Sequence, residues 1–283
     1  MDLIESPSAM TSWARDQARA GKIIALVPTM GAFHEGHLCL MRHAAGLADR
    51  VVVSLFVNPL QFGPREDLAR YPRNLPRDLE LAAGAKVDLV FAPAVDAMYP
   101  QGSLTRVQVA ELTDTLCGAR RPGHFDGVTT VVAKLFNIVG PQVAVFGRKD
   151  LQQLAVIRRL TLDLNWAVEI IGHPIVREAD GLAMSSRNIY LTPAGRCSAL
   201  ALHRVINFAR QRAATGEADA AALTAEVRAR LLMDPAVRVD YVSIVHQHRL
   251  VATPILTRDS VLALAVFIGT TRLIDNGLLL TEE

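Results

Sequence analysis

Short runs of Val, Ile, Leu and Ala recur through residues 1–176 and alternate with longer stretches of helical periodicity. Each run is apolar at almost every position, a pattern typical of strands that are buried on both faces of a sheet. Strands that alternate with helices predict a parallel sheet with right-handed crossovers. The predicted strands are Lys22–Val27, Val51–Val57, Val87–Phe91, Gln142–Phe146 and Val168–Ile171, and the predicted helices between them are His37–Ala48, Leu75–Ala83, Val128–Val139 and Leu151–Leu164.

The remainder of the chain, residues 177–283, has a different order, in which helices come first and strands follow. This order is typical of an α+β domain. We therefore expect an α/β protein with a Rossmann-like, doubly wound parallel sheet over residues 1–176, a smaller C-terminal α+β domain over residues 177–283, and a link near Pro174–Gly181. The expected elements of the second domain are a helix from Thr192-Pro193 to about Ala213, a helix over about Ala218–Leu232, and strands at Val237–Val245, Val261–Ile268 and Thr271–Ile274.

Charge and hydropathy exclude several classes of protein. The formal net charge is only +2 and no segment resembles a basic recognition helix, so we expect no nucleic-acid partner. The longest aliphatic run near the C-terminus, Val261–Ile268, is far shorter than the ~20 residues of a membrane-spanning helix, and the acidic segment Met1–Glu5 does not resemble a signal peptide. The three widely spaced cysteines, Cys39, Cys117 and Cys197, form no disulfide framework or metal-ligand spacing. These features predict a soluble, cytoplasmic protein with no membrane role.

The first predicted strand runs into a loop, Pro28–Phe33, and then into His34-Glu35-Gly36-His37 at the start of a helix. In open α/β sheets ligands bind beyond the carboxyl ends of the strands, and a helix N-terminus offers N–H groups to phosphates. Two histidines three residues apart can face the same side of the first helical turn. A P-loop is excluded because His37-Leu38 stands where a P-loop has Lys-Ser/Thr. A zinc-protease helix is excluded because it needs two histidines four residues apart, whereas His34 and His37 are three apart. A purely structural pair of histidines remains the alternative.

Three further segments carry polar side chains that could bind a phosphorylated ligand or a polar substrate. The first places Lys149 at the end of a strand, with Asp150 as a candidate helix cap. The second offers two hydroxyls and an arginine, which can wrap a triphosphate. The third contains Gln61, which can donate and accept hydrogen bonds. A solvated turn, an interdomain linker and a surface glutamine are the respective alternatives. The three segments are Phe146–Gln153, Asp180–Asn188 and Val57–Gly63.

Together these segments resemble the HxGH signature of the nucleotidyltransferase superfamily and, within it, the pantothenate synthetase (pantoate–β-alanine ligase) family. The resemblance extends from residue 23 to residue 276. The segments that carry it are Pro28–Gly31, His34–His37, Phe56–Phe62, Arg70–Arg73, Arg121–Phe125, Gly147–Asp150 with Gln152-Gln153, Met184–Asn188 and Thr271–Asn276.

The resemblance implies an ATP-dependent reaction in two steps. The carboxylate of (R)-pantoate would attack the α-phosphorus of ATP and release pyrophosphate, and the amine of β-alanine would then attack the acyl carbon of pantoyl adenylate and release AMP. Charge crowding on the phosphates opposes the first step, so preorganised positive charge and hydrogen-bond donors are expected. The resemblance also implies an ATP- and pantoate-binding first domain, a second domain that acts as a lid, a requirement for Mg²⁺, and a homodimer.

The resemblance also implies roles for individual residues. Four are catalytic: His34, His37, Lys149 and Arg187. The family assigns proton donation to His37, but we expect both histidines to act mainly as hydrogen-bond donors to the phosphates. Gln61 and Gln153 would hold pantoate, and Gln61 would also meet β-alanine. Asp78 is a candidate contributor to Mg²⁺ binding through water, with the ion held mainly by the phosphates. Within the expected ATP site, Lys149 and Ser185 to Arg187 would contact phosphate, Asp150 would lie near the ribose, and Val176 would lie against the adenine. The full ATP-binding set is Met30, Gly31, Ala32, Phe33, His34, Glu35, Gly36, His37, Gly147, Arg148, Lys149, Asp150, Val176, Met184, Ser185, Ser186 and Arg187.

Four positions depart from the family pattern: Phe33, Arg77, Arg148 and Leu151. The two arginines add positive charge, which we expect to affect ATP or metal binding. Two other functions fit the same fold, namely a nucleotidyltransferase that transfers AMP to a substrate phosphate and a non-catalytic ATP-binding regulator. The amide side chains of Gln61 and Gln153, which stand where an AMP transferase would need cations for a substrate phosphate, argue against the first function. The retained side chains argue against the second, namely His34, His37, Lys149 and Arg187.

Overall fold

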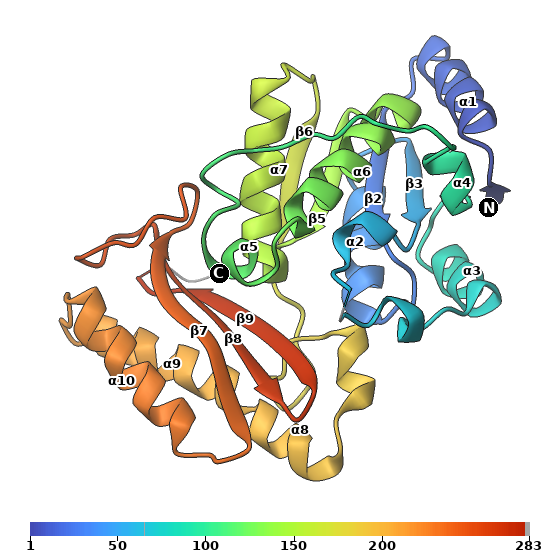
Figure 1. The fold of residues 1–283 in the computed structure, drawn as a ribbon. Helices are drawn as coiled ribbons and strands as arrows, with labels where there is room; N and C mark the ends of the chain where they lie inside the picture. The colour runs from blue at the N-terminus through green and yellow to red at the C-terminus, as the bar shows by residue number, and fades with distance from the viewer. Residues whose placement is uncertain (65, 281–283) are drawn as a thin grey trace. The chain divides into compact units, whose positions relative to one another are not determined.

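The structure, a computed structural model, describes residues 1–64 and 66–280; Arg65 and residues 281–283, which belong to the two predicted domains, lie outside the described residues. The chain divides into two compact units (Figure 1). The first unit comprises Met1–Gly147 and Val156–His173, and the second comprises Arg148–Ala155 and Pro174–Glu283. The domain limits drawn from the sequence, 1–176 and 177–283, remain a prediction.

The first unit is built on a six-stranded parallel sheet with the order β1-β4-β3-β2-β5-β6, which confirms the predicted doubly wound α/β fold. Strand β2 (Ile24–Thr29) pairs with β3 (Arg50–Leu55) along its whole length, but with β5 (Val143–Gly147) over only two residue pairs. Pro28 lies beyond those pairs and has no N–H to donate. The chain order reverses between β2 and β5, and ligands bind at such switch points. The remaining strands are β1 (Asp2–Ile4), β4 (Leu89–Phe91) and β6 (Glu169–His173).

Both faces of this sheet are covered by helices, which explains the uninterrupted apolar runs in the sequence. On one face, Val27 and Val53 pack with the buried residues Met41 of α2 (Glu35–Ala45) and Ala82 of α3 (Leu75–Gly84). Successive residues of a strand point to opposite faces, so Leu26 and Val52, both with no exposed surface, belong to the other face. Helices α1 (Pro7–Arg19) and α6 (His124–Val139) pack on each other, and α1 also contacts β1 and β2.

The sequence analysis missed the first two elements, β1 and α1. Strand β1 has three residues, lies at the sheet edge and leaves Asp2 and Leu3 exposed, so it lacks an apolar run. Helix α1 is capped by Ser6, whose hydroxyl accepts from the Ala9 N–H, with Pro7 at its first position. The remaining short elements of this part of the chain are α4 (Val95–Met98), α5 (Leu116–Arg120) and the 3-10 turns Pro59–Gln61 and Leu68–Arg70.

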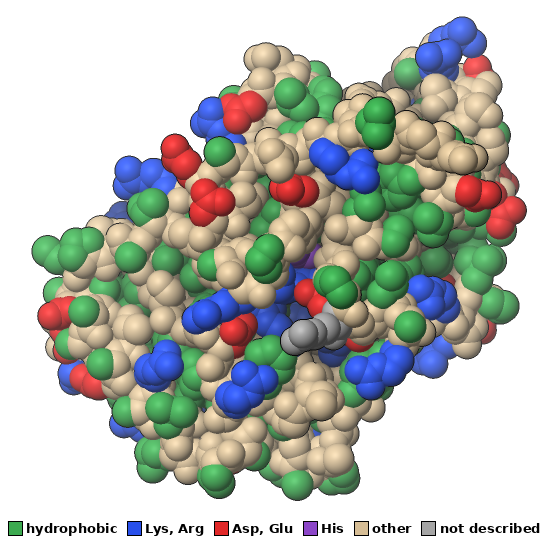
Figure 2. All heavy atoms as spheres, viewed as in Figure 1, with side chains coloured by type: hydrophobic (Ala, Val, Ile, Leu, Met, Phe, Trp, Pro, Cys, Tyr) green, Lys and Arg blue, Asp and Glu red, His purple; other side chains and the backbone are tan. Residues whose placement is uncertain are grey.

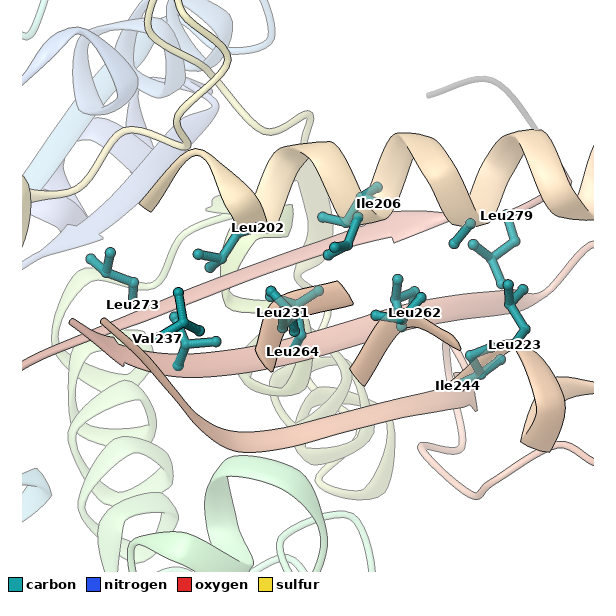
Figure 3. Close-up of a cluster of buried hydrophobic side chains, with 14 of the residues drawn as sticks. Leu202, Ile206, Leu223, Leu231, Val237, Ile244, Leu262, Leu264, Leu273 and Leu279 are labelled. Atoms are coloured by element: carbon teal, nitrogen blue, oxygen red, sulfur yellow. The ribbon is translucent and has the colours of Figure 1, made fainter. Parts of the chain in front are cut away.

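The second unit contains an antiparallel sheet with the order β7-β8-β9, packed against helices, which confirms the predicted α+β arrangement. Figure 3 shows Leu202 and Ile206 of α9 facing strand residues such as Leu262 and Leu273. Gly277 permits this close packing, because a Cβ there would lie 2.6 Å from the Ile206 side chain. The elements are α8 (Pro193–Ala199), α9 (Ala201–Ala214), α10 (Ala220–Leu232), β7 (Val237–His246), β8 (Ser260–Ile268) and β9 (Thr271–Leu278).

Two predicted elements of the second unit differ from the structure. The single helix expected from Thr192-Pro193 to about Ala213 is two helices, with a turn at Leu200 that lets Ala199 and Leu202 enter the same core. The last strand, expected over Thr271–Ile274, continues to Leu278. The predicted strand ended at Ile274 because the next residue, Asp275, is charged and breaks the apolar pattern.

Within the described ranges, no helix is both long enough and apolar enough to cross a membrane. Figure 2 shows acidic and basic side chains interspersed over the face that it displays.

Candidate active site

The loop between β2 and α2 is held in an unusual backbone conformation by one buried carboxylate. Gly31 and Ala32 have φ values of 84° and 53°, in the left-handed region. Asp78 of α3, 2% exposed, accepts the Ala32 N–H at 2.9 Å and the Phe33 N–H at 2.8 Å, one on each carboxylate oxygen. A Cβ at Gly31 would lie 3.0 Å from the Asp78 Oδ2. Asp78 therefore supports the loop that leads to the histidines, a role that the sequence analysis did not foresee.

His34 and His37 lie together at the N-terminus of α2. His34 is the N-cap residue and His37 is at the third helical position, with their ring centroids 4.1 Å apart, so both face the same side of the first turn. The His34 N–H donates to the Nδ1 of His37 at 3.4 Å. In a neutral His37 ring that accepts at Nδ1, the hydrogen resides on Nε2. Phe33 packs its ring 5.6 Å from the His37 ring. Glu35 points elsewhere, since its carboxylate pairs with Arg42.

The side-chain amide of Gln61 is oriented by a buried network within the first unit. Asn58, 1% exposed, donates from Nδ2 to the Gln61 Oε1 at 3.1 Å, which leaves the Gln61 amide nitrogen pointing away from Asn58. That nitrogen lies 3.0 Å from the sulfur of Met30. Tyr99 donates its hydroxyl hydrogen to the Asn58 Oδ1 at 2.9 Å, and burial raises the pKa of this phenol to about 12. The phenol therefore remains a donor throughout the physiological range.

The segment Arg121–Phe125 fixes the backbone of Gln61. The Nδ1 of His124 lies 2.8 Å from the Gln61 carbonyl oxygen, which can only accept, so Nδ1 carries the hydrogen. Arg121 donates to the Nε2 of His124 and to the same carbonyl, at 3.1 Å and 3.3 Å, and forms an ion pair with Glu66. Gly127 allows α6 to approach, because a Cβ there would lie 2.4 Å from the Leu60 backbone. The sequence singled out this segment only by its resemblance.

Lys149 lies in the second unit, in a 3-10 turn (Arg148–Asp150) that leads directly into α7 (Leu151–Asp163). Desolvation by burial lowers the pKa of the Lys149 ammonium, the nearby Arg187 guanidinium lowers it further, and Asp150 and Asp275 oppose the shift. Arg187, the other cation predicted to bind phosphate, belongs to the same unit as Lys149 and lies near enough to disfavour the charged form of Lys149.

The loop that contains Ser185, Ser186 and Arg187 begins at the end of a short hairpin. The Met184 N–H donates to the Val176 carbonyl at 3.0 Å, so these two predicted nucleotide-binding residues are paired through their backbones. The Ser185 hydroxyl accepts the Arg187 N–H at 3.3 Å and caps the 3-10 turn Ser186–Tyr190. Glu178 accepts a hydrogen bond from the Asn188 side chain at 2.7 Å and thereby ties the far end of the loop to the hairpin.

The other predicted site residues lie beside these segments. Gly147 is the last residue of β5, Asp150 is exposed, and Gln153 is partly exposed in the first turn of α7. Among the described residues, no group of three or more His, Cys, Asp or Glu side chains could hold a metal ion. The sequence analysis included Asn58 and Asn276 in the segments it singled out but gave them no role, and most of their contacts span long distances in the sequence.

The fold and these strand-end segments define a doubly wound α/β protein of the nucleotide-binding type, and comparison with known proteins agrees. The family model for pantoate-beta-alanine ligase matches residues 2–278. A pantothenate synthetase from Heliobacterium modesticaldum is 58% identical over 276 residues, which is 98% of each chain. The crystal structure of pantothenate synthetase from Thermus thermophilus matches 99% of this chain and 100% of its own, with a TM-score of 0.94 and 44% identity.

A third relative is similar in structure although more distant in sequence. Pantoate-beta-alanine ligase from Francisella tularensis, crystallised with beta-gamma ATP and β-alanine, matches 100% of this chain and 99% of its own, with a TM-score of 0.82 and 32% identity. This chain belongs to the pantoate–β-alanine ligase family, whose reaction is the ATP-dependent condensation of pantoate with β-alanine.

Proposed function

We propose that the chain forms pantothenate through a pantoyl-adenylate intermediate, with the residue roles that the resemblance implied. A pantoate carboxylate oxygen attacks the α-phosphorus of ATP, and the bond from that phosphorus to the β-phosphate bridging oxygen breaks. The β-alanine amine then attacks the acyl carbon, AMP leaves with the former carboxylate oxygen, and the nitrogen loses a proton. The observation that carries this proposal is the pair of histidines, whose ring centroids lie 4.1 Å apart at the N-terminus of α2.

His34 and His37 act as hydrogen-bond donors to the triphosphate. Their position at the N-terminus of α2 adds the positive end of the helix dipole. A hydrogen on Nε2 of His37 is the donor that a phosphate oxygen needs. Each donor is expected to contribute about 2–4 kcal/mol to transition-state stabilisation, by analogy with single oxyanion donors. The remainder of Met30–His37 contacts the nucleotide.

Lys149 and Arg187 supply positive charge to the phosphates from the second unit. A lysine whose ammonium is partly desolvated interacts more strongly with an anion than a solvated lysine does, because less water must be removed on binding. Ser185 and Ser186 add hydroxyl donors beside Arg187. Gly147, Arg148 and Asp150 contact the nucleotide, with Asp150 near the ribose, and Val176 and Met184 lie against the base.

Gln61 and Gln153 hold pantoate. The orientation of Gln61 supports this role, because Asn58 occupies its amide oxygen and the amide nitrogen remains as the donor for a carboxylate or hydroxyl oxygen. Gln61 also meets β-alanine in the second step. Amide donors bind a carboxylate without neutralising its charge, so the carboxylate remains nucleophilic.

Mg²⁺ fits this chain as an ion that accompanies ATP. Both oxygens of Asp78, the one carboxylate singled out for the metal, already accept backbone N–H groups, which favours contact with the ion through water. The triphosphate oxygens are suitable ligands, and Mg²⁺ would offset their charge during attack. We also propose that the protein functions as a homodimer in the cytoplasm, on family resemblance.

Isotope exchange between pyrophosphate and ATP tests the proposed intermediate. Labelled pyrophosphate should enter ATP when pantoate is present and β-alanine is absent, because the first step is reversible on its own. Exchange should vanish when pantoate is omitted. A folded, ATP-binding protein that shows no pantoate-dependent exchange would refute the adenylate mechanism.

A further inference from the structure

Strand β9 carries two adjacent buried polar residues, Asp275 and Asn276, which are 3% and 5% exposed. They belong to a segment that the sequence singled out but that has no role in the function proposed above. Adjacent strand residues point to opposite faces of a sheet, so the pair can reach two different segments. We refer to Asp275 and Asn276 together as the β9 anchor.

Asn276 holds the backbone of the turn that contains Lys149. Its Nδ2 donates to the carbonyl oxygens of Arg148 at 3.0 Å and Lys149 at 2.9 Å. Carbonyl oxygens only accept hydrogen bonds, so the amide nitrogen must face the turn, and both of its hydrogens are used. Residues separated by 127 positions in the sequence are thus joined where Lys149 leaves the backbone.

Asp275 holds the hairpin that precedes Ser185-Ser186-Arg187. Its two carboxylate oxygens accept from both terminal nitrogens of Arg177, at 2.7 Å and 3.0 Å, in a bidentate ion pair. Arg177 also donates to the Gly181 carbonyl at 3.1 Å, and the Asp275 Oδ1 accepts the Asn276 N–H at 2.8 Å. Strand β9 therefore supports both the turn that carries Lys149 and the hairpin that leads to Arg187.

We propose that Asp275 and Asn276 are positioning residues for the ATP phosphates, which keep the Lys149 turn and the hairpin before Arg187 at a fixed separation. This inference rests on the proposed function of Lys149 and Arg187. Two cations that repel each other would otherwise separate, and holding them in place before ATP arrives is the preorganisation that phosphoryl chemistry requires. Asn276 acts through Lys149 and Asp275 acts through Arg177, so neither needs to touch the substrate.

The test is Asn276→Ala, with ATP binding measured by calorimetry and kinetics measured in the complete reaction. Loss of both amide donors should weaken ATP binding and raise the KM for ATP by roughly 10- to 100-fold, while the KM for β-alanine changes less than about twofold. The serine hydroxyl of Asn276→Ser can donate to only one carbonyl at a time, so the KM for ATP of this variant should lie between those of the unmodified protein and Asn276→Ala. Asn276→Ser also decides the question if the alanine variant does not fold.

Asp240→Asn is the matched control, since Asp240 of β7 is partly buried and pairs with Arg272, which lies on β9 as Asn276 does. It should lower the melting temperature without changing the KM for ATP. Unchanged ATP binding in Asn276→Ala, or equal increases in the KM values for ATP and β-alanine, would overturn the proposal. If the unmodified protein lacked pantoate-dependent exchange, the proposed function would fail, whereas ATP binding would still decide whether the β9 anchor positions Lys149.

Discussion

The predicted site residues of the two units are held in place in different ways. In the first unit, His34 and His37 are neighbours on one helical turn, and the loop before them needs only one distant residue, Asp78. In the second unit, Lys149 and the hairpin before Arg187 depend on a strand near the C-terminal end of the described chain. The difference teaches that a local motif needs little distant support to set its geometry, whereas separate cationic segments need a common support.

The two units also differ in the kind of group they offer. The first presents two histidines at a helix N-terminus, and the second presents Lys149 and Arg187, with the pKa of the Lys149 ammonium lowered mainly by desolvation on burial. Neutral donors are expected to govern the chemical step, because they act on charge as it develops. Cations are expected to govern ATP binding more strongly. Variants on the two sides should therefore separate turnover from ATP affinity.

The largest effect is expected for His37→Ala, which removes a donor from the first unit. Pantoate-dependent exchange should fall roughly 10²- to 10³-fold, while pantoate binding is retained. His43→Ala is the control, because His43 lies on the same helix with its ring 5.3 Å from the His173 ring. Near-normal exchange by His37→Ala would show that the helix N-terminus alone suffices.

A smaller effect is expected for Asp78→Asn, which tests the single distant support of the first unit. The amide keeps one acceptor and places an N–H group against a backbone N–H, so stability should fall by about 1–3 kcal/mol and exchange by roughly 10- to 100-fold. Asp88→Asn is the control. Asp88 also accepts a backbone hydrogen bond, from the Val51 N–H at a distance of 2.8 Å, but it does not support the loop before the histidines. If Asp78→Asn lowered the exchange rate no more than Asp88→Asn does, Asp78 would not be a support that the histidines need.

The smallest effect is a shift in pH dependence. Burial lowers the pKa of Lys149 below its usual value of 10.5, Arg187 contributes to the decrease, and Asp150 and Asp275 oppose it. The cation binds ATP, so kcat/KM for ATP should decline as pH rises through this lowered pKa. Asp275→Asn removes one opposing charge and should move that decline to lower pH. Asp240→Asn should leave it in place, and an equal shift in both variants would exclude a specific influence of Asp275.

The sequence predicted those features that arise from neighbouring residues. Buried apolar runs identified five of the six parallel strands, and the spacing of His34 and His37 predicted their common face. It did not reveal β1, because an edge strand with exposed side chains has no apolar run. It also ended β9 before Asp275, since a buried charge breaks the apolar pattern and its partner Arg177 is known only from the fold.

Roles that depend on long-range contacts were the hardest to predict. The family resemblance associated Asp78 with Mg²⁺, which stays a prediction, but the sequence did not reveal that its carboxylate supports the backbone of Ala32 and Phe33. Asn58 and Asn276 are amides with no local signature, and Tyr99 and Gly127 contact Asn58, as Arg148 and Lys149 contact Asn276, only in the folded chain.

Pantoate labelled with ¹⁸O in its carboxylate tests the central claim, adenylate formation, most directly. If a carboxylate oxygen attacks the α-phosphorus and AMP is then displaced by β-alanine, one labelled oxygen should appear in the phosphate of AMP for each pantothenate formed. Mass spectrometry of the AMP and pyrophosphate decides the result. Label in pyrophosphate, or AMP without label, would contradict the account.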